Sequence, residues 1–368
     1  MSTGSPPSRC WHWTIRPGAD PRPALPVEPR RGRGELSITL SALPREPDAL
    51  RRLPLVTLYL SERCNSRCRT CDYWQHGRAD MDLAAVSRLL PSLRRLGTRT
   101  VMLSGGEPLL NRQWQEIAAL LKGEGLELWL LTSGLSLAKH AQQAGELFRT
   151  ITVSLDGTDA PTYAAIRGVD AFDVVCRGIR SAADTGARVT VRVTLQRANF
   201  RQLTAFVDLA QRLGAHQVSF LAVDVANPHA FARREGFQSD LALHPAELAA
   251  LARLIGGLEL DRAAAFASGF IAETPAKLRR IHQYFAAVCG LGPYPPVRCN
   301  APQFSAVVDA QGRVSPCFFI AGPGDARVRG GLDEVLNRAD MTALRASIRV
   351  GGRRECATCV CSMWRECA

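Results

Sequence analysis

Residues 55–74, "LVTLYLSERCNSRCRTCDYW", join an apolar run to three cysteines that lie within eight positions of one another. The apolar run is partly β-branched, which predicts a short buried strand. Cys64, Cys68 and Cys71 follow in a loop that also carries arginines. Since three thiols cannot all pair with one another, the loop predicts a metal site, a partner elsewhere in the chain, or a cluster held by three protein ligands.

Five more apolar stretches of this kind follow, and amphipathic segments separate them. The predicted strands cover residues 100–106, 126–134, 150–157, 187–195 and 217–223. Short strands that alternate with helices predict a parallel sheet with right-handed crossovers. The six units suit either an open doubly wound sheet or an incomplete barrel. Farther along, residues 298–319 predict a hairpin that turns at "DAQG", residues 309–312.

The unusual sequences fall where the predicted strands end. The cysteine loop follows the first strand, "SGGEP" (104–108) the second, "TSG" (132–134) the third and "SLDG" (154–157) the fourth. Because the carboxyl ends of parallel strands meet at one edge of a sheet, these four loops predict a single pocket at that edge.

The composition is that of a globular protein, with 46% hydrophobic and 22% charged residues and a net charge of +12. Only three of the 46 basic residues are lysines and the arginines are scattered, so a nucleic-acid partner is not expected. An anionic small molecule or an acidic peptide fits the charge at least as well. No apolar stretch is long enough for a membrane span, and the first residues lack a signal sequence. We therefore expect a cytoplasmic protein, in which disulfides are not expected among the twelve cysteines. The clustered cysteines predict metal or iron–sulfur ligation, while Cys176 fits a small buried hydrophobic residue.

Two motifs identify a family. Residues 64–73, "CNSRCRTCDY", carry the CxxxCxxCx-aromatic pattern, and "GGEP" at residues 105–108 follows one strand later. Together they resemble the radical S-adenosylmethionine (SAM) superfamily over residues 54–225. The resemblance implies an α/β fold, an incomplete (β/α)6 TIM-like barrel. It also implies that the three cysteines of the loop hold a [4Fe–4S] cluster, whose fourth iron binds the amino and carboxylate groups of SAM. Zinc with His76 as a fourth ligand is the alternative for this loop, and its place at the strand ends disfavours it.

The resemblance also implies which residues bind SAM: Tyr73, Gly105, Gly106, Glu107, Pro108, Ser154, Asp156 and Arg192. The tyrosine lies near the adenine, and the glycines of "GGEP" let the backbone approach the methionyl amine. Glu107 lies near the ammonium group and Pro108 fixes the loop. Ser154 and Asp156 meet the ribose hydroxyls or the methionine end, although such residues are also common turn formers. Arg192 pairs with the SAM carboxylate, and "TSG", where relatives more often have "TNG", gives Ser133 only a minor role.

The C-terminal cysteines resemble the auxiliary-cluster extension of SPASM/twitch radical SAM proteins. A hairpin that carries Cys299 and Cys317 precedes the pair Cys356 and Cys359. The resemblance implies that these four thiolates hold one auxiliary [4Fe–4S] cluster. Two such clusters would need a CxxCx5CxxxC run with one more cysteine beyond it, whereas this chain has CxxCxCx5C at Cys356, Cys359, Cys361 and Cys367.

The auxiliary ligand set leaves alternatives open. Cys361 could replace Cys356 or Cys359, and Cys289 and Cys367 are spare thiols. A zinc ion bound by the same four thiolates would staple the small C-terminal section without redox activity.

Changes of pattern along the chain predict four segments. Residues 1–52 form an irregular Pro- and Arg-rich extension, in which residues 34–41 suit one short strand. Residues 53–225 form the radical SAM core and residues 226–285 a helical connector. Residues 286–368 form a small cysteine-rich domain of the SPASM/twitch type.

These features predict a radical SAM oxidoreductase. The resemblance implies that the enzyme reductively cleaves SAM at the first cluster to a 5′-deoxyadenosyl radical, which abstracts a substrate hydrogen atom. We expect oxidation (dehydrogenation) of a small-molecule or carrier-borne substrate in a biosynthetic pathway, with the auxiliary cluster as electron acceptor. A flavodoxin- or ferredoxin-type protein is the expected electron donor.

Other functions stay open. One is maturation of a ribosomal peptide by crosslinking or epimerisation, in which Cys289 or Cys361 would donate a hydrogen atom. Residues 1–52 are shorter and richer in proline than a leader-peptide-binding domain, which favours the small substrate. The C-terminal cysteine spacing also differs from that of molybdenum-cofactor cyclases, which end in Gly-Gly. The alternative of another class is a zinc-stabilised nucleic-acid-binding protein.

Overall fold

The computed structural model describes residues 49–227, 239–327, 330–349 and 352–365. The predicted N-terminal extension lies outside the described residues up to residue 48, and so do its short strand and Cys367. Among the described helices, none is both long and apolar enough to cross a membrane.

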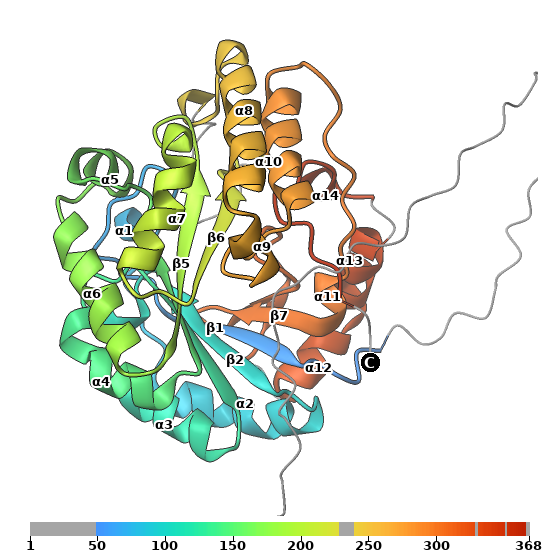
Figure 1. Ribbon diagram of the computed structural model, residues 1–368. Coiled ribbons are helices and arrows are strands. Elements are labelled where there is room, and N and C mark those ends of the chain that lie inside the picture. The colour runs from blue at the N-terminus through green and yellow to red at the C-terminus, as the bar shows by residue number, and fades with distance from the viewer. Residues whose placement is uncertain (1–48, 228–238, 328–329, 350–351, 366–368) are drawn as a thin grey trace, which may run out of the picture.

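Six parallel strands form the core of the structure (Figure 1). They are β1 (Leu55–Ser61), β2 (Thr100–Gly105), β3 (Glu127–Thr132), β4 (Thr150–Ser154), β5 (Arg188–Leu195) and β6 (Gln217–Ala222). Each strand is hydrogen-bonded to the next along the chain. The described strands leave the sheet open, with β6 at one edge. The predicted incomplete barrel is therefore confirmed.

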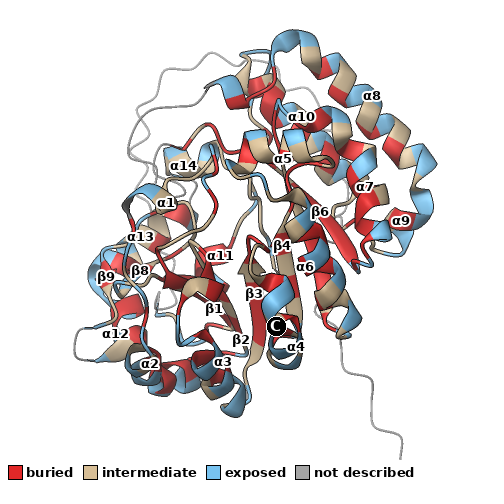
Figure 2. Cartoon of the chain, turned by 90° about the vertical axis from the view of Figure 1, so that its left-hand side faces the viewer, coloured by how far each residue is buried: buried red, intermediate tan, exposed pale blue. Residues whose placement is uncertain are grey.

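Helices cover the outside of this sheet (Figure 2). They are α2 (Leu83–Arg95), α3 (Trp114–Gly123), α4 (Leu137–Leu147), α5 (Ala160–Arg167), α6 (Phe172–Asp184) and α7 (Leu203–Arg212). Their buried faces pack on alternate residues of the strands, such as Leu58, Leu103 and Val191, which are wholly excluded from solvent. The residues between them on β2, β4 and β5 point to the other face of the sheet and are mostly only partly buried.

The first turn of several helices is fixed by a side-chain cap. The Asp82 carboxylate accepts a hydrogen bond from the Ala85 backbone at the start of α2, and Asp159 accepts one from Thr162 at the start of α5. Such caps supply acceptors that the first turn of a helix lacks. The Asp82 cap begins the helix after the cysteine loop, and the Asp159 cap begins the helix after the "SLDG" loop.

The C-terminal hairpin continues the same sheet. Strand β7 (Ser305–Val308) pairs in parallel with β1, so β1 has a partner on each side. Strands β8 (Arg313–Ser315) and β9 (Gly324–Asp325) add antiparallel pairs beyond it. The predicted hairpin at "DAQG" is confirmed, with Gly312 in the left-handed region at φ 82°. The later helices are α11 (Ala301–Phe304), α12 (Gly331–Asn337), α13 (Ala339–Arg349) and α14 (Arg354–Ala357).

The opposite edge of the sheet is covered by the connector. It contains α8 (Pro245–Asp261), α9 (Ala263–Ala267) and α10 (Pro275–Val288). Between α9 and α10 the chain runs beside β6, where Val218 donates to the Phe270 carbonyl and Ala272 donates to the Val218 carbonyl. These two hydrogen bonds satisfy backbone groups that an edge strand would otherwise expose.

Helix α12 is attached to α2 by a polar contact on the outside of the barrel. The Ser92 hydroxyl donates to Asp333 at 2.6 Å and accepts from the Leu332 backbone at 3.0 Å. Arg95 forms an ion pair with the same carboxylate at 2.7 Å. The hydrogen bonds from Arg95 and Ser92 hold the pKa of Asp333 at about 2, below the usual 3.8.

Replacing Asp333 with Asn should lower the free energy of unfolding near neutral pH by about 1 kcal/mol, since the pair is partly exposed. A carboxylate whose pKa is lower in the folded state stabilises above its unfolded pKa and stops doing so as pH falls through the folded value. The difference between the two proteins should therefore narrow from about pH 4 downward. Urea unfolding at a series of pH values measures it, and Asp340→Asn, which removes an exposed carboxylate, is the control. A difference that stays constant down to about pH 3 would contradict this assignment.

Candidate functional site

The cysteine loop leaves and re-enters the fold at the end of β1. Glu62 donates its backbone N–H to the Ala79 carbonyl and Met81 donates to the Leu60 carbonyl, each at 2.9 Å. The Ser61 hydroxyl donates to Asp80, which also forms an ion pair with Arg63. These contacts close the neck of the loop, so its cysteines are held at the carboxyl ends of the strands.

The middle of the loop is attached to the end of α5. The backbone N–H of Arg67 donates to the Arg167 carbonyl at 2.9 Å, and that of Arg69 donates to Ile166 at 3.2 Å. Gly168 ends this helix at φ 68°, and a Cβ there would lie 2.3 Å from the Arg67 carbonyl oxygen. Glycine is therefore required for this close approach.

The three loop thiols are free and lie in one electrostatic environment. Cys68 is buried, while Cys64 and Cys71 are partly buried. Burial raises the pKa of Cys64 to about 11 and that of Cys71 to about 12, and Cys68 contributes to both shifts. A bound metal would therefore have to displace protons from these thiols.

Hydrogen bonds to sulfur follow one pattern at four of the cysteines. The backbone N–H two residues later donates to Sγ in each of these cysteines: Cys64 at 3.4 Å, Cys299 at 3.5 Å, Cys317 at 3.4 Å and Cys359 at 3.3 Å. Such donors stabilise thiolate charge and are typical of sulfur ligands in iron–sulfur sites. No three His, Cys, Asp or Glu side chains of the described residues converge on the position of a single ion. A four-iron cluster takes its thiolates from more widely spaced positions, and the side chain of His76 lies outside the described part.

The two glycines of "GGEP" pack against the start of the cysteine loop. A Cβ on Gly105, at φ 119°, would lie 2.5 Å from the Ser61 carbonyl oxygen, and one on Gly106 would lie 2.4 Å from that of Arg63. The Glu107 backbone also donates to the Arg63 carbonyl at 2.8 Å. The glycines thus have a role in addition to the predicted approach to the methionyl amine, because they set the position of the backbone that leads into the first cysteine.

Glu107 is fully buried at the end of β2. Its carboxylate accepts hydrogen bonds from the Thr132 hydroxyl at 2.8 Å and from the backbones of Ser133 at 2.7 Å and Leu109 at 3.1 Å. The Ser133 hydroxyl is in turn 3.1 Å from the Asn65 side-chain oxygen in the cysteine loop. The donors of Glu107 are neutral, and a buried carboxylate with neutral donors fits the predicted neighbouring ammonium group.

Asp156 is already engaged within the protein. Its carboxylate accepts from the Thr194 backbone at 2.7 Å and from Arg167 at 3.2 Å, and it is only 3% exposed. Any contact with the ribose, as predicted, would add to these bonds. Ser154, the other predicted ribose contact, pairs in register with Arg192 across β4 and β5.

Several buried polar atoms around the loop make no hydrogen bond within the described residues: Ser66 Oγ, Tyr163 Oη, Arg167 Nε, Arg192 Nε and Gln196 Nε2. Unpartnered buried polar atoms are rare in folded proteins and often face a ligand. Arg167 lies within electrostatic reach of Cys68 and Cys64. The predicted site thus contains donors that fit a negatively charged cluster and SAM, and Arg192 is one of the residues expected from the sequence.

Sequence reasoning missed part of this site. Arg167 and Tyr163 sit on α5, where they look like ordinary residues of an amphipathic helix. Glu273 lies between α9 and α10, accepts from Ser219 and Phe220 at 2.7 Å, and is electrostatically coupled to Arg192. No local motif marks any of these residues, because only the fold brings them to the strand ends.

The C-terminal thiols form a second group. Cys299, Cys317, Cys356 and Cys359 are free and partly buried. Burial raises the pKa of Cys317 to about 12, with smaller effects from Cys299 and Cys356, so the thiols lie near one another. Asn300 fixes the end of the chain beside them, since its side chain donates to the Arg365 carbonyl at 2.6 Å.

The two candidate hydrogen donors lie in different places. Cys361 is near Lys277 and Arg192, which oppose the rise of its pKa caused by burial. Cys289 ends α10 and donates to the Leu243 carbonyl at 3.2 Å. Cys361 is therefore the thiol that shares its surroundings with a predicted SAM-binding residue.

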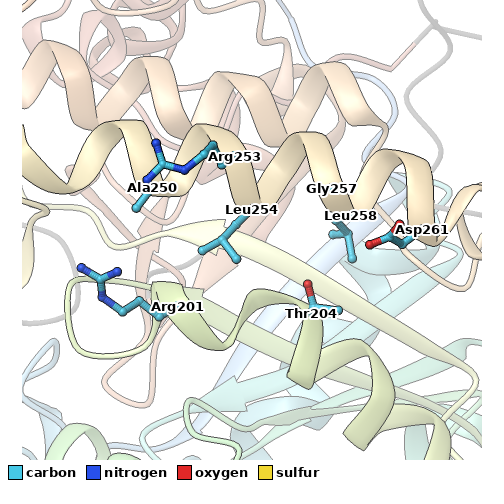
Figure 3. Close-up of a pocket in the computed structure, with 8 residues that line it drawn as sticks. All are labelled: Arg201, Thr204, Ala250, Arg253, Leu254, Gly257, Leu258 and Asp261. Carbon is cyan, nitrogen blue, oxygen red and sulfur yellow. The ribbon is translucent and has the colours of Figure 1, made fainter.

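Two grooves lie on the surface of the described residues. One of about 480 Å³ borders the cysteine loop and is lined by Cys64, Arg67, Trp74, Gln75 and Arg78. The other, of about 370 Å³, lies between α7 and α8, with Arg201 and Arg253 at one end and Asp261 at the other (Figure 3). None of the predicted site residues lines the second groove.

Known proteins resemble the chain most clearly in its sheet region. Residues 58–210 match the Radical SAM superfamily. The Probable GTP 3′,8-cyclase of Saccharolobus solfataricus is 33% identical over 178 residues, which are 46% of this chain and 57% of that protein. The chain therefore spans less than two thirds of the length of this curated relative.

Two solved structures share the fold at low identity. SuiB of Streptococcus suis, bound to precursor peptide SuiA, has 14% identity and a TM-score of 0.61, and the alignment covers 82% of this chain and 68% of that one. Native anSMEcpe with bound AdoMet and Cp18Cys peptide has 16% identity and a TM-score of 0.60, with 79% and 82% covered. These likenesses concern the fold, and they agree with the open α/β barrel described above.

Replacing Gly106 with Ala should reduce the iron held by the cysteine loop, because the new Cβ would displace the Arg63 backbone next to Cys64. We expect iron content after anaerobic reconstitution to fall by up to about four atoms per chain, the content of one [4Fe–4S] cluster. Gly256→Ala is the control, since nothing lies within 4 Å of a Cβ there. Equal iron contents in the two variants would show that the close packing of "GGEP" is not needed for the site.

Proposed function

The chain carries a radical SAM domain over residues 58–210, and from that premise we propose that it is an enzyme that oxidises its substrate by hydrogen-atom abstraction. When bound, a [4Fe–4S] cluster and SAM supply a 5′-deoxyadenosyl radical as the abstracting species. The protein contributes the thiols, the contacts that orient SAM, and a site that excludes water. Cys64, Cys68 and Cys71 are the proposed ligands of this first cluster.

The observation that carries the proposal is the closeness of the two groups of thiols. Burial raises the pKa of Tyr59 far above its usual value, and Cys71 and Cys317, one from each group, both add to the shift. The Tyr59 ring also meets Tyr73 edge to face, with centroids 5.9 Å apart. An oxidation leaves a substrate radical that must lose an electron, and a second cluster held by the hairpin that pairs with β1 is suited to accept it.

Cys299, Cys317, Cys356 and Cys359 are the proposed ligands of that auxiliary cluster. The hydrogen bond from the Cys361 backbone to the Cys359 sulfur favours Cys359 over Cys361 as a ligand. Cys361 then stays free on the side of Arg192, where a hydrogen-donor role would require it.

We propose a small or carrier-borne anionic substrate bound near Arg192 and Lys277. Both cations lie within electrostatic reach of Glu273, which accepts hydrogen bonds from Ser219 and Phe220 of β6. Two other substrate classes are supported by similarity. The precursor peptide bound to SuiB favours a peptide, and the GTP 3′,8-cyclase name of a relative favours a nucleotide. Incubating the reduced enzyme with SAM and GTP, and separately with candidate peptides and small molecules, compares them by 5′-deoxyadenosine yield.

The electron that starts each turnover would come from a flavodoxin or a ferredoxin. The described thiols are all free, which fits the reducing cytoplasm expected from the sequence. The rival function, a zinc-stabilised nucleic-acid-binding protein, predicts stoichiometric zinc and no absorbance near about 400 nm after reconstitution with iron and sulfide.

Replacing Cys64, Cys68 and Cys71 together with Ala should abolish 5′-deoxyadenosine formation, because SAM is cleaved only at the cluster they hold. The variant should still bind about four irons at the C-terminal thiols. Chromatographic detection of 5′-deoxyadenosine and colorimetric iron analysis measure both. Turnover by this variant would end the radical SAM assignment, and about eight irons would mean two auxiliary clusters.

Removing the Cys317 thiol (Cys317→Ala) should leave SAM cleavage measurable while product formation falls, because abstraction precedes electron transfer to the auxiliary cluster. Product made by the unaltered enzyme in deuterated buffer should be two hydrogens lighter than substrate, with one 5′-deoxyadenosine per product. Mass spectrometry distinguishes this from epimerisation, which adds one deuterium to an unoxidised carbon. That label, if lost on replacing Cys361 or Cys289, would identify the hydrogen donor and rule out oxidation.

A further inference from the structure

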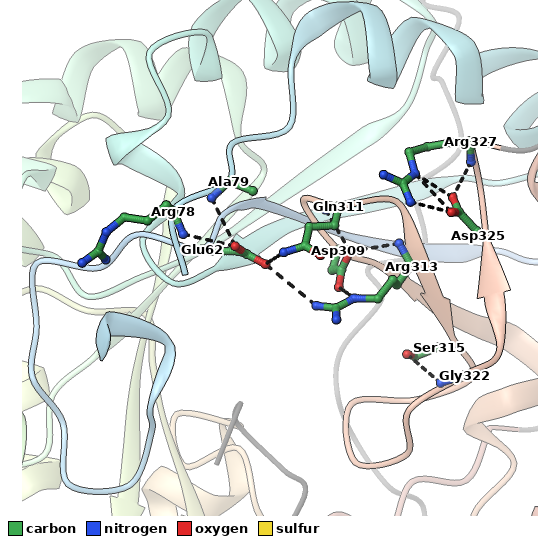
Figure 4. A network of polar contacts seen from close by, with 10 residues as sticks. All are labelled: Glu62, Arg78, Ala79, Asp309, Gln311, Arg313, Ser315, Gly322, Asp325 and Arg327. Carbon is green, nitrogen blue, oxygen red and sulfur yellow. Dashed lines mark hydrogen bonds and ion pairs between the residues drawn. The ribbon is translucent and has the colours of Figure 1, made fainter. Parts of the chain in front are cut away.

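Glu62 connects the neck of the cysteine loop to the C-terminal hairpin (Figure 4). One carboxylate oxygen, Oε2, accepts from the backbones of Arg78 at 3.2 Å and Ala79 at 3.1 Å. The other, Oε1, accepts from the Gln311 side-chain amide at 2.9 Å, and Arg313 lies 3.8 Å away. The Glu62 side chain, which comes from the outgoing arm of the loop's neck, therefore bonds to the returning arm and to a hairpin that follows far later in the sequence.

The loop neck is shaped to keep this carboxylate in place. Glu62 is 8% exposed, and a Cβ on Gly77 would lie 2.1 Å from the Glu62 Cβ. Only glycine at this position lets the returning arm approach so closely. A buried carboxylate needs its hydrogen-bond donors, and here the hairpin supplies one of them.

The hairpin turn is built to present the amide of Gln311. Asp309 accepts from the backbones of Gln311 and Arg313, both at 2.9 Å. Arg313 forms an ion pair with Asp309 at 2.6 Å, and Gly312 takes the left-handed conformation that the turn requires. The Gln311 amide is thus carried by a turn that hydrogen bonds and an ion pair of its own hold in shape.

We propose that Glu62 and Gln311 are positioning residues through which the C-terminal hairpin sets the geometry of the cysteine loop. Gln311 lies between Cys299 and Cys317 in the sequence, and Glu62 lies two residues before Cys64, so the bridge joins the two thiol groups outside either ligand set. This inference rests on the proposed function, because the cysteine loop is taken to hold the first cluster. The conformation of the loop can nevertheless be measured without catalytic activity.

The chain permits a test by exchanging the two side chains. Gln311→Glu places two carboxylates against each other and should open the neck. In the double variant Glu62→Gln/Gln311→Glu, the new amide on the loop side can accept from Arg78 and Ala79 through its carbonyl oxygen. Its NH₂ group can then donate to the new carboxylate on the hairpin, so the double variant should restore every hydrogen bond that the single variant loses. Arg338→Ala is the control, since Arg338 lies in the C-terminal section outside the hairpin turn and pairs with the exposed Asp340.

Two measurements on the full chain decide the outcome. Amide hydrogen exchange of residues 63–79 should be about tenfold faster in Gln311→Glu, and SAM should bind the reconstituted protein about tenfold more weakly. Both should return to within about twofold of the starting values in the double variant and be unchanged in Arg338→Ala. Unchanged exchange in Gln311→Glu, or a double variant no better than the single one, would overturn the inference. If exchange changed as expected but the unaltered enzyme formed no 5′-deoxyadenosine from SAM, the proposed function would fail and the inference about the loop would stand.

Discussion

Strand β1 is paired on both sides, and the arrangement of the site depends on that constraint. Its partner β2 ends in "GGEP", which packs against the start of the cysteine loop. Its other partner, β7, leads into the turn whose Gln311 reaches Glu62 at the loop's neck. Because hydrogen bonding fixes both neighbours relative to β1, the cysteine loop between them is placed from two directions. The second group of thiols is brought beside the first by the same pairing.

The charged side chains near the cysteines, Arg167 and Glu107, are placed to interact with a bound charged group such as a cluster or SAM. Arg167 is buried next to Asp156 and within reach of the thiols, and its Nε makes no hydrogen bond among the described residues. Burial keeps the thiols protonated, with raised pKa values. Binding of a cluster would replace the thiol protons with iron and would place a negatively charged group within reach of Arg167, in addition to Asp156. Glu107 in the "GGEP" loop has the opposite role. It is a buried carboxylate whose hydrogen-bond donors are neutral, so it is suited to a neighbouring positive charge.

The sequence was sufficient for what depends on local patterns. The six strands, the helices between them, the hairpin at residues 309–312 and the convergence of four loops followed from apolar periodicity and turn residues. The hydrogen bond between Glu62 and Gln311 could not be predicted, because a glutamate before a cysteine motif and a glutamine in a turn are both ordinary residues. Arg167 and Glu273 were missed for the same reason. Each acquires its role from a contact across the fold, and no spacing in the sequence encodes such contacts.

The pairing of β1 with β7 also orders events during synthesis. The second edge of β1 stays open until β7, at residues 305–308, has been made. During that time β1 is an apolar strand with unpaired backbone groups on one side, in a nascent barrel that is otherwise complete. Exposed edges of this kind attract other chains. The ribosome-bound intermediate should therefore be the most aggregation-prone form of this protein, and truncations that remove the hairpin should be recovered chiefly with chaperones.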